Sequence, residues 1–103
     1  MSTEKDNKRF YKMADSFIDL ANSHCDKTER SEVGSSMLFA SARFSAFVVA
    51  SFAKDKAAYE VEVDNAVNHF STEFKRMLTE NLEQYKTAFD EQPRYEHLIN
   101  KET

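Results

Sequence analysis

The chain has 103 residues and a formal net charge of −4, with 31% charged and 41% apolar residues. That length predicts one domain, large enough to bury a core without disulfides or metal ions. The acidic balance and the lack of a basic stripe argue against nucleic acid or an anionic membrane as a partner. One glycine and one proline are too few for a fold rich in turns, which favours long helices with short connections.

The N-terminus and the cysteine content both suggest a cytoplasmic protein. The first ten residues, MSTEKDNKRF, are charged and contain none of the apolar run that a signal peptide needs. Cys25 is the single cysteine of the chain, which excludes a disulfide within the chain and a pair of metal-binding thiolates.

The first predicted helix covers residues 7–25. Its apolar residues recur every three or four positions and form one stripe, whereas polar residues occupy the opposite side, as in an amphipathic helix. The stripe consists of Phe10, Met13, Ala14, Phe17, Ile18, Leu20 and Ala21. The segment 26–34 breaks this pattern, and Ser31 is a candidate N-cap for the next helix.

The second predicted helix contains SSMLFASARFSAFVVASFA, residues 35–53. Its large apolar side chains point in every direction, as in a helix that is buried on most sides or spans a membrane. The apolar run falls short of the roughly 20 residues that a membrane span needs, and Arg43 lies near its centre. We therefore expect a buried core helix. Ala42, Ala46 and Ala50 form a ridge of small residues that lets another helix approach closely.

The third predicted helix begins after Asp55, a candidate N-cap, and ends at about residue 91, before Pro93. The alternating segment 59–63 resembles a strand but is too short and isolated to pair. Helical spacing is strong in the residues that follow, which include Val63, Ala66, Val67, Phe70, Phe74, Met77, Leu78, Leu82, Tyr85 and Phe89.

The predicted fold is all-α: a three-helix antiparallel bundle with a buried second helix and a long third helix. A single helical domain would cover residues 7–91, and residues 92–103 would form a weakly ordered tail. The third helix would extend roughly 50 Å and the first only about 30 Å, so the apolar stripe of the third continues past the shorter helices. This excess favours a homodimer.

The predicted interface lies on the second and third helices. Its candidate residues are Phe39, Ala42, Ala46, Phe47, Phe74, Leu78, Asn81 and Leu82. Asn81 falls inside the apolar stripe, where a buried amide would set the register of two helices and an exposed one would have no role. Arg43 is a candidate buried charge: either it pairs with a carboxylate or reaches the rim, which we favour, or it binds an anion in a pocket.

Catalytic, metal and cofactor sites are not expected. His69 shares one side of the third helix with Glu62 and Glu73, but Arg76 and Glu80 lie there too, so a charge-paired, solvated face is the better interpretation. With one glycine, the chain has no phosphate-binding loop, and no Ser-His-Asp pattern occurs.

Three blocks of the chain together resemble a known family, the small bacterial domain of unknown function 3144. They are FYKMADSFIDLAN (residues 10–22), MLFASARFSAFVVAS (37–51) and NHFSTEFKRMLTENLEQY (68–85). The resemblance covers residues 10–89 and implies a short, soluble, all-helical bacterial protein. It implies no activity, substrate or cofactor.

These observations lead to two hypotheses about function. The first is a non-enzymatic protein-interaction module that self-associates, with an unknown protein as a further candidate partner. The alternative is a small-ligand binder, with an apolar pocket among the phenylalanines and Arg43 holding a carboxylate or phosphate.

Overall fold

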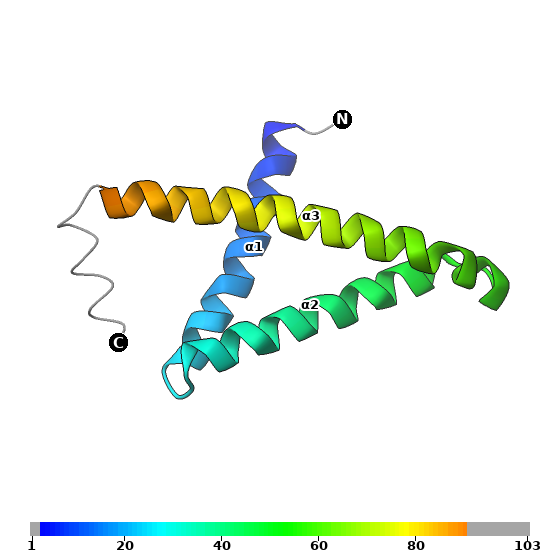
Figure 1. Cartoon of the computed structure of the whole chain (residues 1–103), viewed down its shortest axis with the longest axis horizontal. Coiled ribbons are helices and arrows are strands. Elements are labelled where there is room, and N and C mark those ends of the chain that lie inside the picture. Colours follow the sequence, from blue (N-terminus) through cyan, green and yellow to red (C-terminus); the bar gives the residue numbers. More distant parts are fainter. Residues whose placement is uncertain (1–2, 91–103) are drawn as a thin grey trace. The chain divides into compact units, whose positions relative to one another are not determined.

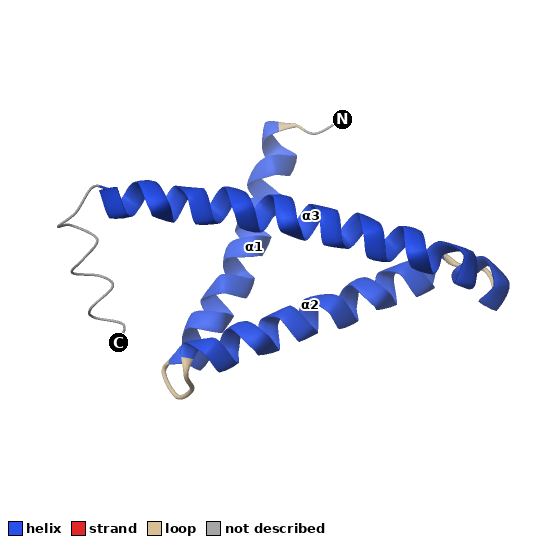
Figure 2. Cartoon of the chain, in the orientation of Figure 1, coloured by secondary structure: helices blue, strands red, loops and turns tan. Residues whose placement is uncertain are grey.

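The computed structural model describes residues 3–90, which form three α-helices and no strand (Figures 1 and 2). This confirms the predicted all-α, three-helix fold. The chain divides into two units: Met1–Phe52 contains α1 (Glu4–Cys25) and α2 (Arg30–Phe52), and Ala53–Thr103 contains α3 (Lys56–Asp90). The predicted tail, residues 92–103, lies outside the described residues.

Helix α1 begins three residues earlier than predicted, because Thr3 caps it. The Thr3 hydroxyl accepts a hydrogen bond from the Asp6 backbone N–H at 3.0 Å, and the Asp6 carboxylate accepts one from the Thr3 backbone N–H at 3.4 Å. This reciprocal capping box satisfies two of the N–H groups that a helix start leaves unpaired. Arg9 adds an ion pair to Asp6 at 3.0 Å.

The connection between α1 and α2 is shorter than the predicted break at 26–34. Helix α2 begins at Arg30, so Ser31 and Gly34 lie inside the helix, and Ser31 is not the N-cap. The carbonyl of Glu29 accepts hydrogen bonds from the backbone N–H groups of Glu32 and Val33, each at 3.1 Å. The Glu29 carbonyl therefore accepts the first hydrogen bonds of α2, and the helix begins at the next residue, Arg30.

The prediction of a buried second helix does not hold within the unit Met1–Phe52 taken by itself. Val33, in the first turn of α2, is 7% exposed and is the one buried residue among residues 3–90. Half-buried Cys25 and Thr28 lie at the neighbouring turn. A helix that is apolar on all sides needs apolar neighbours on most of them, and α1 supplies these to α2 at too few positions.

Helix α3 agrees closely with its predicted bounds. The Asp55 carboxylate accepts a hydrogen bond from the Ala58 N–H at 2.8 Å, which confirms the predicted N-cap. The alternating segment 59–63 is helical, and the helix continues for 35 residues to Asp90 without a buried side chain. At about 1.5 Å per residue it is roughly 52 Å long.

Replacing Gly34 with alanine is expected to stabilise the protein by about 0.5–1 kcal/mol, since glycine in a helix interior loses more backbone entropy than alanine. A Cβ atom at Gly34 would meet nothing within 4 Å, so no clash offsets this gain. Urea unfolding followed by circular dichroism, at one fixed protein concentration, measures the change. The reverse substitution in the same helix, Ala40→Gly, should destabilise by a similar amount. A G34A variant that is less stable would contradict the assignment of Gly34 to an open helix surface.

Candidate functional site

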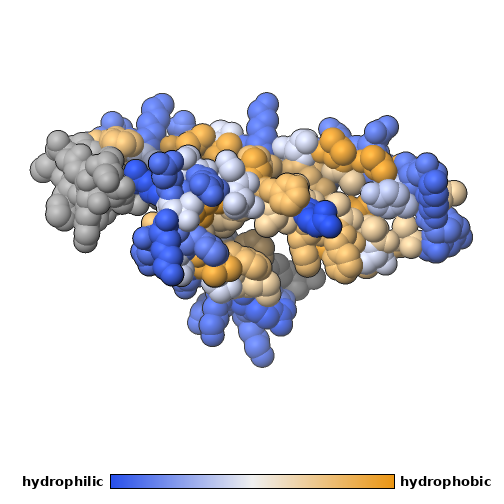
Figure 3. Space-filling model, turned by 90° about the horizontal axis from the view of Figure 1, so that it is seen from below, coloured by the Kyte–Doolittle hydropathy of each residue, from blue (hydrophilic) through white to orange (hydrophobic). Residues whose placement is uncertain are grey.

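The strongest candidate for a functional site is the apolar surface that α2 and α3 leave exposed. Large apolar side chains on all three helices are 37–85% exposed, and Figure 3 shows them reaching the surface between polar residues. Large apolar surfaces that a soluble protein leaves exposed often mark binding sites.

On α2 the exposed surface is rich in phenylalanine. Phe39 and Phe47, both predicted interface residues, are 66% and 62% exposed. Phe44 is exposed as well, and its ring centroid lies 5.8 Å from that of Phe47. Ala42 and Ala46 are also exposed, so the predicted small-residue ridge is open to a partner.

On α3 the exposed apolar residues form one line along the helix, which we call the α3 stripe. Its members recur at helical spacing and are all exposed. The predicted interface residues Phe74, Leu78 and Asn81 belong to it, and Leu82 lies at its edge. The stripe consists of Val63, Val67, Phe70, Phe74, Leu78, Asn81, Tyr85 and Phe89.

The amide of Asn81 is already engaged within its own helix. Its side-chain Nδ2 donates a hydrogen bond to the backbone carbonyl of Met77 at 2.8 Å. Covering an amide in an apolar stripe is unfavourable when the amide loses its water without gaining hydrogen bonds. This bond therefore lowers the cost of covering Asn81 with a partner.

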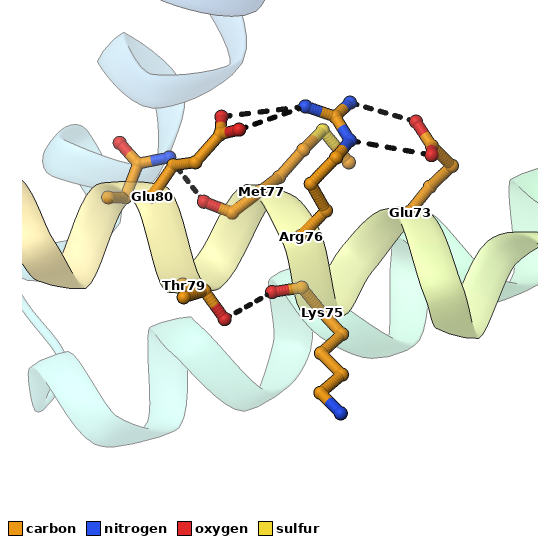
Figure 4. Close-up of polar contacts among 7 residues, drawn as sticks. Glu73, Lys75, Arg76, Met77, Thr79 and Glu80 are labelled. Carbon is orange, nitrogen blue, oxygen red and sulfur yellow. Dashed lines mark hydrogen bonds and ion pairs between the residues drawn. The ribbon is translucent and has the colours of Figure 1, made fainter.

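A charge-paired face of α3 (Figure 4) lies away from the α3 stripe, since Arg76 is two positions from both Phe74 and Leu78. The Arg76 guanidinium contacts the Glu73 carboxylate at 2.9 Å and the Glu80 carboxylate at 3.3 Å. The hydrogen bond and charge of Arg76 lower the pKa of Glu73, and the hydrogen bond and charge of Glu73 raise the pKa of Arg76. This confirms the charge-paired, solvated interpretation of this face.

The geometry does not assemble a metal site around His69. Within residues 3–90, no group of three or more histidine, cysteine, aspartate or glutamate residues could hold a metal ion. Glu73 binds Arg76, and the His69 ring lies edge-on to Phe70 with centroids 5.2 Å apart.

Arg43, the predicted buried charge, is exposed in the single chain. The prediction assumed that α2 would be covered, and the residues around Arg43 are exposed with it. Its side chain thus lies on an exposed surface of α2, beside the exposed residues Phe39 and Phe47.

Helix α2 is also long and apolar enough to cross a membrane, judged by length and composition alone. The whole helix has 23 residues and meets the length criterion, whereas the sequence-based expectation concerned the shorter apolar run within it. A core helix of a soluble protein and a signal sequence meet the same criterion. Arg43 near the middle would be costly in the hydrocarbon interior.

Comparison with known proteins identifies the family. The family model described as "Protein of unknown function (DUF3144)" matches residues 10–86. The chain belongs to this family. The match confirms the resemblance carried by the three sequence blocks. No curated protein and no solved structure matches the chain.

Some exposed aromatic residues of these surfaces were not among the predicted interface residues. They include Phe44 on α2, and Phe70, Tyr85 and Phe89 on α3. All of them belong to the apolar pattern of the sequence, so the signal was present. Selecting them required knowing that α2 and the end of α3 remain uncovered.

Replacing Arg76 with glutamine is expected to raise the pKa of Glu73, because the hydrogen bond and charge that stabilise its carboxylate are lost. Since the folded pKa is lower than the unfolded one, this pair stabilises the helix at neutral pH, and that contribution disappears as the pH falls through the pKa of Glu73. NMR titration of the Glu73 side chain measures the midpoint. Lys75→Gln removes a neighbouring charge without touching Glu73 and should shift the midpoint less. Equal shifts in both variants would contradict the specific pair.

Proposed function

We propose that this protein is a non-enzymatic, cytoplasmic interaction module that self-associates through α2 and α3, with the homodimer as its basic unit. One observation carries the proposal: Val33 is the one buried residue among residues 3–90, while large apolar residues on every helix are exposed. The predicted residues Phe39, Phe47, Phe74 and Leu78 are all available to a partner.

Energetics supports a second chain. Ordering each residue of a helix costs about 1–2 kcal/mol of backbone entropy, and burial of apolar surface is the main compensation. In proteins, most of the stability of a helix comes from packing of its apolar face rather than from its intrinsic helix propensity. A chain with a single buried side chain gains little compensation alone, so its folding should be coupled to association.

An interface between copies also suits the polar residues of these helices. The ridge of Ala42 and Ala46 permits a close approach between helices. Arg43 at such an interface would be flanked by a second acidic chain, since each copy carries 18 acidic and 14 basic residues. A guanidinium pairs well with a carboxylate when both are partly desolvated.

Light scattering after size-exclusion chromatography, over a dilution series, should give twice the monomer mass. Val67→Asp, in the α3 stripe, should weaken the dimer at least tenfold, because a carboxylate without a partner would be buried at the interface. The matched control Val61→Asp lies well off the stripe. Val61 is 72% exposed and Val67 61%, so both variants add the same charge at similarly exposed positions of one helix.

Helicity measured by circular dichroism on the same samples tests the coupling of folding to association, since it should fall together with the mass. A fully helical monomer at every concentration would refute self-association. If V67D and V61D lower the molecular mass measured by light scattering to the same extent, the stripe has no specific role in the dimer. Co-sedimentation of the protein with phosphatidylcholine–phosphatidylglycerol vesicles would instead assign the exposed surface of α2 to a membrane.

A further inference from the structure

We propose that the α3 stripe is covered by α3 of a second copy, with the two helices antiparallel about a two-fold axis that passes between Phe74 and Leu78. This inference rests on the proposed self-association and adds the orientation and register of the two helices. Three features of α3 support it: the spacing of the stripe, the sizes of the residues that would meet, and the distribution of charge.

The spacing of the stripe fits two long helices in contact over most of their length. Its steps are four, three, four, four, three, four and four residues from Val63 to Phe89. Eleven residues in three turns is close to the natural period of an α-helix, so such a stripe stays on one face with little supercoiling. A straight partner helix can therefore follow it.

Side-chain sizes favour the antiparallel orientation. About this axis, Val63 would face Phe89 and Val67 would face Tyr85, so that each valine of the stripe meets a large aromatic residue. Phe74 would face Leu78 beside the axis. A parallel pair would instead match each residue with itself, which leaves space between two valines and crowds two Phe89 rings. Alternation of large and small residues is how helix interfaces reach close packing.

The charge along α3 favours the same orientation. Residues 56–73 contain one lysine and four carboxylates, whereas residues 74–90 contain three basic and three acidic residues. A parallel pair would place the two acidic halves side by side, within the screening length of about 8 Å at physiological salt. An antiparallel pair places each acidic half against a neutral one and also opposes the two helix dipoles.

Asn81 is compatible with this arrangement. A parallel pair would bring two Asn81 side chains together, which is how a single buried asparagine sets register in parallel coiled coils. In the antiparallel pair Asn81 lies near Phe70 instead. Its Nδ2 already donates one hydrogen bond to the Met77 carbonyl within its own helix, so part of the hydrogen-bonding capacity of the amide is met without a second Asn81.

The area of the stripe is sufficient for a stable interface. An aromatic side chain can bury about 150–250 Å². Four aromatics on each copy, each about half exposed, would together bury on the order of 800 Å² between two copies. The aliphatic residues of both stripes bring the total toward the roughly 1,200–2,000 Å² of specific protein interfaces.

Disulfide trapping tests the orientation directly. In a Cys25→Ser background, V67C and Y85C variants are prepared separately, mixed, allowed to exchange subunits and oxidised. In the antiparallel dimer, positions 67 and 85 of opposite chains face each other, whereas two V67C sites lie roughly 27 Å apart. A disulfide requires Cα atoms about 4.4–6.8 Å apart. We expect a cross-linked heterodimer from the mixture and none from V67C alone.

The controls separate this inference from self-association itself. V61C mixed with Y85C should not form a disulfide, because Val61 lies off the α3 stripe. Cross-linking of V67C with itself would overturn the antiparallel orientation. If light scattering shows a dimer but neither the V67C–Y85C mixture nor V67C alone forms a disulfide, α3 does not form the interface. Self-association itself would then remain supported. A wild-type monomer would refute both. V63C with F89C provides a second antiparallel pair should either first variant lose helicity by circular dichroism.

Discussion

Each unit of this chain carries more apolar surface than that unit covers by itself, and the rest of the structure depends on this imbalance. Val33 is the one buried residue among residues 3–90, although 41% of the whole sequence is apolar. Local interactions such as the capping box at Thr3 and the N-cap at Asp55 define where helices begin. Each such cap stabilises the protein by only about 1 kcal/mol. Caps also bury no apolar surface, so they do not stabilise the packing of one helix against another.

The two candidate surfaces differ in what they demand of a partner. Helix α3 has a single stripe, and Glu73, Arg76 and Glu80 form ion pairs on a different face of the helix. One helix laid along the stripe would therefore cover it. Helix α2 is apolar on all sides, with Phe39, Phe44 and Phe47 exposed, and one neighbour cannot cover it. An assembly that satisfies both helices therefore needs several helices around each α2, which two or more copies would supply.

Residue patterns predicted the local structure well and the location of burial poorly. Helical periodicity placed α3 almost to its ends, and Asp55 was identified as its N-cap because carboxylates accept hydrogen bonds at helix starts. The Thr3 capping box was missed, since its N3 residue is Asp6 rather than glutamate or glutamine. Burial of α2 was predicted because apolar side chains avoid water. That rule specifies that Phe39 and Phe47 need a neighbour, and it does not specify which chain provides the neighbour.

Arg43 limits the ways in which α2 can be covered. A guanidinium midway along an apolar helix is costly in a bilayer interior and equally unfavourable in a protein interior without a carboxylate. Between two copies of an acidic chain, carboxylates are abundant and the long arginine side chain can reach the rim of the interface. The same residue that makes α2 a poor membrane span is therefore compatible with an interface between helices, and the exposed ridge of Ala42 and Ala46 beside it leaves room for that second helix.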